Sequence, residues 1–298
     1  MAVGPPNRYA EQDRVRDVLL QTCSEKPETD AEASRPLGRI GTLETRLATT
    51  AAEVAAAQGV RFRVFAEEMG ATMSPANTRL KRDIDPYDSV CDHLLVFDTA
   101  IEGDREDQIV GTYRLLRGSV ARTDGGFYSE SEFTITDLLE RHPGKHFMEL
   151  GRSCVLPGYR TRRTLELLWQ GNWAYSLQHG IDVMFGCASF AGTRPEDHAL
   201  ALSYLTHCHA ATREWAVSAL PGLYQPMDLV PKEEIEPRRA LSALPPLVKG
   251  YLRLGAMVGD GAFVDHDFRT TDVMIVLPIA RISERYINYY GADAARFS

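Results

Sequence analysis

The sequence predicts an α/β fold built on a sheet that is only partly parallel. Several short runs alternate apolar and polar residues or are rich in β-branched residues, which is typical of strands. One of these runs leads into a long segment with helical periodicity and then into another apolar run, as in a strand, helix, strand unit. The 298 residues are 44% hydrophobic and 25% charged, which is ordinary for a globular protein and excludes disorder along the whole chain.

The elements are expected in a definite order along the chain. The Ala-rich segment 50–65 contains good helix formers and no proline. In the segment 164–179, Leu165, Leu168, Trp169, Trp173 and Leu177 recur at helical spacing and predict one buried face. The expected elements are strand 44–48, helix 50–65, strands 93–98, 109–116 and 146–156, helix 164–179 and strand 183–188.

Residues 39–298 are expected to form one domain, because no Gly/Ser-rich linker and no internal repeat interrupts them. Residues 1–38 carry prolines and charges without sustained periodicity, so we expect a mobile N-terminal tail. The chain has 33 basic and 41 acidic residues, a net charge of −8. This balance argues against a nonspecific nucleic-acid-binding protein.

The cysteine pattern and the hydropathy indicate a cytoplasmic protein. Five cysteines without CxxC spacing argue against a disulfide framework and against a zinc knuckle. The N-terminal residues lack the apolar core of a secretory signal, and the longest uncharged stretches are too short and too polar to span a bilayer. No metal is assigned to His198, His207, Cys208 and His209, because neighbours on one helix point in different directions and no carboxylate completes the set.

A basic turn precedes the helix expected at 164–179. Arg160, Arg162 and Arg163 lie there, with Thr164 as a candidate cap. A helix N-terminus presents unpaired N–H groups and a positive dipole end, so this turn would hold a phosphate well. Without further context, a solvated basic turn that caps one helix is the preferred interpretation.

An acidic run, KRDIDPYDSVCD, surrounds a proline-containing turn at residues 81–92. It is not a calcium EF-hand loop, because the sixth and twelfth positions counted from Asp83 are Asp88 and Leu94 instead of glycine and glutamate. The run is either a solvated acidic turn or a site for a substrate that carries ammonium groups.

Glu149 and Arg152 lie three residues apart on one expected strand. Their side chains would point to opposite faces of a regular strand, so a shared site requires a β-bulge between them. Gly151 is the expected position of the kink. The alternative is a structural role, with Glu149 or Arg152 paired to Arg114 or to an aspartate.

Five segments taken together resemble one enzyme family, the ornithine lipid N-acyltransferases, which are related to the acyl-homoserine-lactone synthases. The segments are RFRVFAEEMGA (61–71), RDIDPYDSVCDHLLV (82–96), VGTYRLL (110–116), FYSESEF (127–133) and ELGRSCV (149–155). The downstream segments WQGNWAY, DVMFGCASFAGT, LPPLVKGYLRLGA and YINYYGADA are similar to the acyltransferases and not to the synthases. The resemblance covers residues 40–298.

This resemblance implies a fold similar to the Gcn5-related N-acyltransferases (GNAT), with a mixed central sheet flanked by helices and splayed at its central strands. It also implies an acyl carrier protein thioester as donor and transfer of a 3-hydroxy fatty acyl group to the α-amine of ornithine, which gives lyso-ornithine lipid. The same reaction on glutamine is the alternative. No cofactor besides the donor and no nucleic-acid partner is expected.

The resemblance also assigns roles to residues. The pattern of the synthases carries over at positions that form the amine-side pocket and its charge network. Ala71 stands where the synthases have a tryptophan, which counts against S-adenosylmethionine as substrate, and YRTRRT lacks the glycines of a coenzyme A loop. The assigned residues are Glu149, Arg152 and Ser153 as catalytic, Arg61, Phe65, Asp85, Asp88 and Arg114 as substrate-binding, and Val155, Arg160, Arg162, Arg163 and Thr164 as donor-binding.

The expected mechanism is direct attack of the neutral amine on the thioester, with Glu149 as base, directly or through water. Backbone N–H groups between Ser153 and Val155 would meet the oxyanion. The aspartates would neutralise substrate ammonium groups, while Arg114 and Arg152 would hold its carboxylate or orient Glu149 and the aspartates. A thiol nucleophile at Cys154, with His93 or His146 as base, is the rival hypothesis, but a buried strand cysteine is the preferred interpretation.

The segment 244–258 has the periodicity of an amphipathic helix. Leu247, Tyr251, Leu254 and Val258 would share one face, with Lys249 and Arg253 elsewhere. Such a helix would suit peripheral contact with the cytoplasmic face of the inner membrane, although core packing of a surface helix also explains it. A non-catalytic, haemolysin-like lipid-binding protein is the second function class that follows from this segment.

Overall fold

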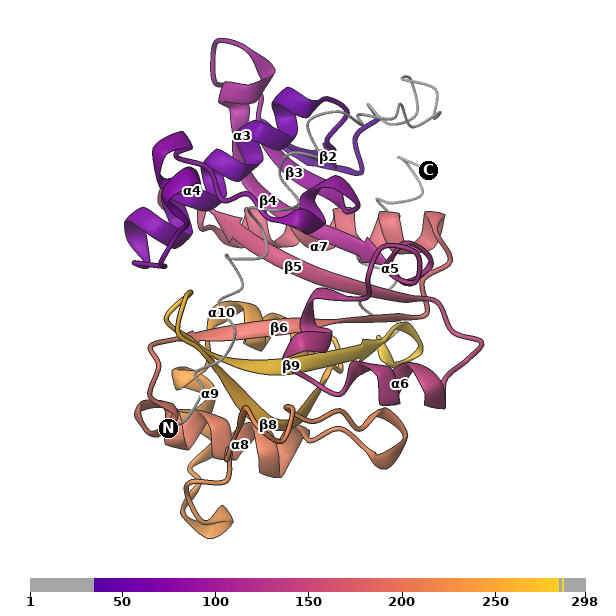
Figure 1. Ribbon diagram of the computed structural model, residues 1–298, viewed down its shortest axis with the longest axis vertical. Helices are drawn as coiled ribbons and strands as arrows, with labels where there is room; N and C mark the ends of the chain where they lie inside the picture. The colour runs from indigo at the N-terminus through magenta and orange to yellow at the C-terminus, as the bar shows by residue number, and fades with distance from the viewer. Residues whose placement is uncertain (1–34, 284–285, 287–298) are drawn as a thin grey trace.

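One mixed sheet of nine strands organises the described part of the chain. The computed structural model describes residues 35–283 and 286. The strand order is β1-β2-β3-β4-β5-β6-β9-β8-β7, and all neighbours are antiparallel except β5 and β6 (Figure 1). The expected mixed sheet is therefore confirmed. The strands are β1 (Gly38–Ile40), β2 (Leu43–Leu47), β3 (Asp92–Asp98), β4 (Ile109–Arg117), β5 (Phe147–Val155), β6 (Val183–Ala191), β7 (Tyr224–Gln225), β8 (Met257–Asp265) and β9 (Thr270–Pro278).

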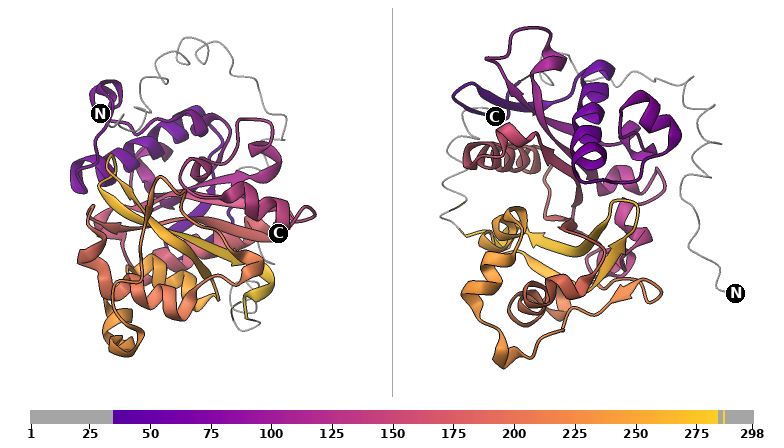
Figure 2. Two further views of the ribbon diagram at one scale, coloured as in Figure 1. Left: turned by 60° about the horizontal axis from the view of Figure 1, so that its bottom comes forward. Right: turned by 90° about the vertical axis from the view of Figure 1, so that its left-hand side faces the viewer.

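Helices cover both faces of the sheet. Helices α7 to α10 lie on one face and share a large apolar core with the strands, while α3, α5 and α6 lie on the other (Figures 1 and 2). A π-helical segment, Arg63–Glu68, extends α3. The α-helices are α3 (Ala51–Phe62), α4 (Pro75–Leu80), α5 (Gly118–Ala121), α6 (Ile135–Arg141), α7 (Arg162–Gln178), α8 (Ala199–His209), α9 (Pro237–Ala243) and α10 (Pro246–Arg253).

Helix α7 begins two residues earlier than expected. Thr161, not Thr164, is the N-cap, and its hydroxyl accepts a hydrogen bond from the Thr164 N–H at 3.3 Å. The Thr164 hydroxyl instead donates to the Tyr159 carbonyl at 2.6 Å. Trp169 is buried as predicted, but Leu177 is 56% exposed because the buried face ends before the last turn.

The helix expected at 244–258 is shorter in the structure. Helix α10 ends at Arg253, and the chain turns at Gly255, whose φ of 94° suits glycine. Val258 belongs to strand β8, so the proposed four-residue apolar face does not exist. Tyr251 is buried against the α7 residue Trp169, which agrees with the core-packing alternative.

The central strands β5 and β6 separate after three paired positions, the last being Glu149 with Phe185. A Cβ on the next β6 residue, Gly186, would lie 2.2 Å from the Leu150 carbonyl oxygen, so only glycine fits where the strands begin to diverge. The expected splay is therefore present, and it opens the sheet between its two halves.

The folded part already includes the last residues of the expected tail. Leu37 is buried, its N–H donates to the Thr45 carbonyl, and Gly38 begins β1. Residues 1–34 and most of the YINYYGADA segment lie outside the described residues. Within the described part, no helix is long and apolar enough to cross a membrane.

Candidate active site

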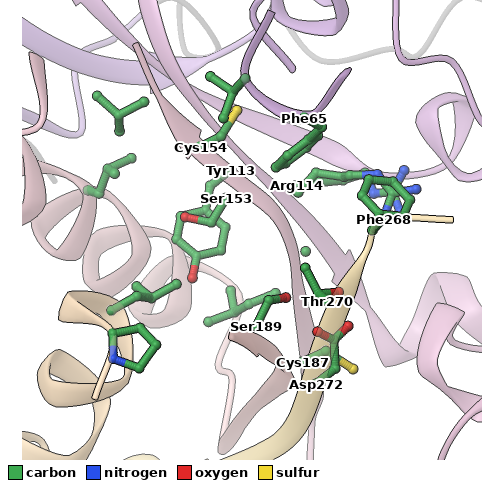
Figure 3. Close-up of a pocket in the computed structure, with 18 of the residues that line it drawn as sticks. Phe65, Tyr113, Arg114, Ser153, Cys154, Cys187, Ser189, Phe268, Thr270 and Asp272 are labelled. Carbon is green, nitrogen blue, oxygen red and sulfur yellow. The ribbon is translucent and has the colours of Figure 1, made fainter. Parts of the chain in front are cut away.

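A cavity of about 850 Å³ lies where β5 and β6 separate. Figure 3 shows some of the residues that line it. One wall is apolar and comes from the π-helical segment, α7 and α10, with Phe65, Leu168 and Leu247 among its residues. The other walls carry charged and polar groups from β4, β5, β6 and β9. The cavity therefore joins an apolar compartment to a charged one, so it suits a ligand pair of which one is apolar and the other is charged.

The predicted bulge brings Glu149 and Arg152 to the same cavity. Strand β5 has one more residue than β4 between the pairs Thr112–Cys154 and Arg114–Gly151. The unusual backbone conformation falls on Arg152, with φ of 51°, and not on Gly151 as expected. Both side chains line the cavity because the extra residue shifts the alternation of the strand.

The Glu149 carboxylate is held in a fixed orientation. It accepts hydrogen bonds from the N–H groups of Tyr128 at 2.7 Å and Ser129 at 2.9 Å, at the start of a 3-10 turn, Tyr128–Ser131. Burial raises the pKa of Glu149 above its ordinary value, although the hydrogen bonds from Ser129 and Tyr128 oppose the shift. A carboxylate whose pKa is raised is a stronger base than an ordinary one, which suits it to accept a proton.

Arg114 and Arg152 form the cationic wall of the cavity. Arg114 Nη1 bonds both carboxylate oxygens of Asp85 at 2.6 Å, and Arg152 bonds Asp83 at 3.1 Å and Asp85 at 3.0 Å. Burial alone would raise the pKa of Asp85, but the Arg114 guanidinium holds it below its ordinary value. Phe268 packs against Arg152, with the guanidinium 4.5 Å from the ring centre.

Arg61, Asp85 and Asp88 lie behind this wall and do not line the cavity. The fully buried Arg61 bonds Asp88 through two nitrogens at 2.7 and 2.9 Å and Asp83 at 2.8 Å. Asp88 also accepts from Gln58 at 2.7 Å. In this geometry the aspartates position the two cavity arginines. Direct contact of Asp85 or Asp88 with a substrate ammonium, as the sequence suggested, would require these ion pairs to open.

The donor-side residues divide into two groups. Arg160 is engaged, because it pairs with Glu68 through two nitrogens at 2.6 Å each and donates to the Val155 carbonyl at 2.9 Å. Arg162 lines the cavity mouth with a 90% exposed side chain, whereas Arg163 is exposed outside the lining. Lys249 and Arg253 of α10 complete a basic mouth that sequence reasoning had not connected with Arg162.

Backbone N–H groups of β5 face the opening. The Leu156 N–H bonds the Val110 carbonyl of β4 at 2.9 Å. Because N–H groups alternate sides along a strand, the Val155 N–H points away from β4, toward the edge from which β6 has diverged. Ser153 and Ser189 line the cavity from the two separated strands (Figure 3).

The thiol and metal alternatives gain no support from the geometry. Burial raises the pKa of Cys154 to about 12, so the thiolate that a nucleophile needs is disfavoured. The His93 ring is bonded to the Asp88 carbonyl at 2.9 Å, and His146 to the Gly180 carbonyl at 2.9 Å. Among residues 35–283 and 286, no three His, Cys, Asp or Glu side chains are grouped to hold a metal ion.

Comparison with known proteins identifies the family. Residues 60–170 match the family described as Acetyltransferase (GNAT) domain. The L-ornithine N(alpha)-acyltransferase of Rhizobium meliloti (strain 1021) is 70% identical over 268 residues, 90% of each chain. The protein of the same name from Rhodobacter capsulatus is 40% identical over 83% of this chain and 94% of its own. The chain belongs to this acyltransferase family.

Two solved structures resemble the acyltransferase more distantly. The AHL synthase LasI is 14% identical, with a TM-score of 0.44, over 84% of this chain and 95% of its own. FeeM, an N-acyl amino acid synthase, is 13% identical, with a TM-score of 0.40, over 80% and 91%. Family membership makes the chain an N-acyltransferase enzyme, so the hypothesis of a non-catalytic haemolysin-like protein is not retained.

Several cavity residues of the acyltransferase were missed from sequence. Tyr128 and Phe268 flank Arg152, but Tyr128 begins a short 3-10 turn and Phe268 lies in the turn between β8 and β9, and no periodicity fixes such positions. Asp272 and Thr270 line the far side of the cavity on β9. One signal was available for Asp272, since an acidic residue within the run TTDVMIVLP interrupts an otherwise uncharged strand.

Proposed function

We propose that this acyltransferase transfers a 3-hydroxy fatty acyl group from acyl carrier protein to the α-amine of ornithine, giving lyso-ornithine lipid. The observation that carries the proposal is the cavity at the splayed strands, with Glu149 beside two arginines and an apolar compartment next to them. The names of relatives that are 40–70% identical support ornithine over glutamine as the acceptor.

The acceptor would bind in the charged compartment. Arg114 and Arg152 would hold its carboxylate, while the aspartates behind them keep the guanidinium groups in place. Glu149 would take a proton from the α-ammonium, directly or through a water molecule, because only the neutral amine has a lone pair for attack.

The donor would enter from the basic mouth, with its acyl chain in the apolar compartment. The phosphate of the phosphopantetheine arm would lie near Arg162 and the N-terminal N–H groups of α7. The Val155 N–H would bond the thioester oxygen as negative charge develops on it. The amine attacks the thioester carbon, the C–S bond breaks, and the thiol leaves on the carrier protein without an acyl-enzyme intermediate. We expect this reaction in the cytoplasm, with peripheral contact at the inner membrane.

Mass spectrometry of the products tests the proposal. Pure protein is incubated with 3-hydroxyacyl carrier protein and, separately, with ornithine, glutamine, lysine or S-adenosylmethionine. We expect an N-acylated product from ornithine. A product from glutamine alone would mean that glutamine, and not ornithine, is the acceptor. If the protein is shown to be folded and the thioester stays intact with every acceptor, the proposal is overturned. The same assay with the corresponding acyl-coenzyme A tests the choice of donor.

A further inference from the structure

A second carboxylate faces the cavity from strand β9. Asp272 is 7% exposed, lies among the cavity-lining residues, and its Oδ1 has no hydrogen-bond partner among the described residues. The Thr270 hydroxyl, two residues earlier and on the same side of the strand, lies beside this carboxylate and acts on it as a hydrogen-bond donor. Buried polar atoms are rarely left unpaired, so the Asp272 Oδ1 atom indicates a group that the bare protein does not supply.

The surroundings of Asp272 call for a cation. Asp272 lies opposite Ser189 of β6 and Phe263 of β8 in the sheet register. The charged groups that act on it are Asp265 of β8, which is also acidic, and Arg152, which already pairs with Asp83 and Asp85. Burial raises the pKa of Asp272 to about 6, although hydrogen bonds from the Ser189 and Thr270 side chains lower it. At neutral pH the site therefore holds a desolvated negative charge without a dedicated counter-charge.

The two charged ends of the cavity differ in sign. Arg114 lies at one end with Phe268, while Thr270, Asp272, Cys187 and Ser189 gather at the other (Figure 3). Arg152 belongs to the first end, because its guanidinium packs against the Phe268 ring. An amino acid with a cationic side chain carries a carboxylate at one end and an ammonium at the other. Such a molecule complements both ends of this cavity at once.

We propose that Asp272, assisted by the Thr270 hydroxyl, binds the side-chain ammonium of the acceptor and thereby selects a diamino acid over a neutral one. The inference rests on the proposed function and names the residues that set its acceptor class. A neutral side chain such as that of glutamine or norvaline would leave the Asp272 charge buried and unpaired, which costs far more than a lost surface contact.

The test compares ornithine with norvaline, which has a hydrogen in place of the side-chain amine. The ratio of kcat/KM for the two acceptors is measured with 3-hydroxyacyl carrier protein for the wild type, Asp272→Asn and Thr270→Val. We expect the wild-type ratio to be about 100 or more, since a site built around a polar group strongly rejects an analogue that lacks it. We expect Asp272→Asn to lower the ratio at least tenfold, mainly through the KM for ornithine, and Thr270→Val to lower it severalfold.

A matched control is Asp260→Asn. Asp260 is an exposed residue of β8 outside the cavity, bonded to Tyr224 at 3.1 Å, so both the ratio and the activity should stay unchanged. A folded Asp272→Asn protein that loses activity on both acceptors equally would overturn the inference. If that protein does not fold, an unchanged ratio in Thr270→Val would overturn it instead. A wild type that acylates both acceptors equally well also overturns it but leaves the proposed reaction standing, whereas no product from either acceptor refutes the proposed function itself.

Discussion

Asp272 should make the stability of the protein depend on pH. Its folded pKa of about 6 lies above the ordinary 3.8, so the folded state binds the proton more tightly than the unfolded state. The stability that Asp272 contributes is therefore fully present below about pH 4 and is lost as the pH rises through about 6, whereas the depressed pKa of Asp85 acts in the opposite direction. The shift of Asp272 corresponds to about 3 kcal/mol. Urea unfolding of wild type and Asp272→Asn at pH 4 and pH 8 should show similar stabilities at pH 4 and a more stable variant at pH 8. A difference that does not change with pH would contradict the assignment.

Glu149→Gln should distinguish the role of Glu149 in proton transfer from its role in stabilising the fold. The amide oxygen can replace only one of the two carboxylate oxygens that accept from the Tyr128 and Ser129 N–H groups, so one N–H loses its partner, while removal of a buried charge offsets part of that loss. We expect kcat to fall by about 100- to 10,000-fold, the usual contribution of a general base, in a variant that is somewhat less stable but folded at the assay temperature. Steady-state kinetics and thermal unfolding check this, and wild-type activity should decline as the pH falls through the raised pKa of Glu149. A variant that retains most of its kcat would exclude Glu149 as the base.

At the scale of single elements, helix α10 should contribute to donor binding. Lys249 and Arg253 of this helix line the cavity together with Arg162 of α7, and all three side chains are exposed or half-buried. The phosphopantetheine arm of the proposed donor carries a negatively charged phosphate, so reversing two of these charges should raise the KM for the acyl donor about tenfold or more and leave the KM for ornithine unchanged. The double variant Lys249→Glu, Arg253→Glu tests this by steady-state kinetics.

The neighbouring helix α9 offers the matched control. Arg239→Glu reverses an exposed charge outside the cavity lining and should leave the donor KM unchanged. An equal rise in KM for this control would mean that net charge, and not the mouth, governs the effect. Raising the salt concentration should raise the KM of the wild type for the acyl donor, because salt screens the attraction between exposed charges.

Local patterns predicted most elements, and long-range packing decided the rest. Strands 92–98 and 109–117 and helix α7 were predictable because their apolar spacing reports one buried face. The bulge between Glu149 and Arg152 was predictable as well, since two functional groups three apart require it. The end of α10 was not predictable, because the apolar spacing continues past Gly255. The cap at Thr161 was not predictable either, because Thr161 and Thr164 both suit an N-cap.

The candidate site was predictable only in its first half. The arginines and the acidic turn lie within motifs on β4, β5 and the turn before β3, so a resemblance found them. The arginines line the cavity and the aspartates lie behind them, and this difference depends on burial, which cannot be inferred from the sequence. Asp272 comes from β9, which reaches the site only because it pairs with β6 about 85 residues earlier in the chain.

At the scale of the whole molecule, the active site lies at the join between two halves of one sheet. Strands β1 to β5 supply Glu149 and the arginines, strands β6 to β9 supply Asp272, and only three residue pairs of β5 and β6 connect the halves. The distance between the two charged ends of the cavity is therefore set by how β6 leaves β5. Gly186 controls that departure, because its missing side chain allows the Leu150 carbonyl to approach.

Gly186→Ala should therefore impair both stability and acceptor binding. The added Cβ would meet the Leu150 carbonyl oxygen at 2.2 Å, so one strand must shift and the cavity must change shape. We expect a loss of about 1–3 kcal/mol in unfolding free energy, as for an overpacked core, and a rise in the KM for ornithine. The control is Gly222→Ala, where the new methyl group meets no atom within 4 Å and stability should change by no more than about 0.5 kcal/mol. Urea unfolding and steady-state kinetics of both variants decide the matter: a Gly186→Ala enzyme with wild-type stability and KM would show that the join tolerates movement and does not set the geometry of the site.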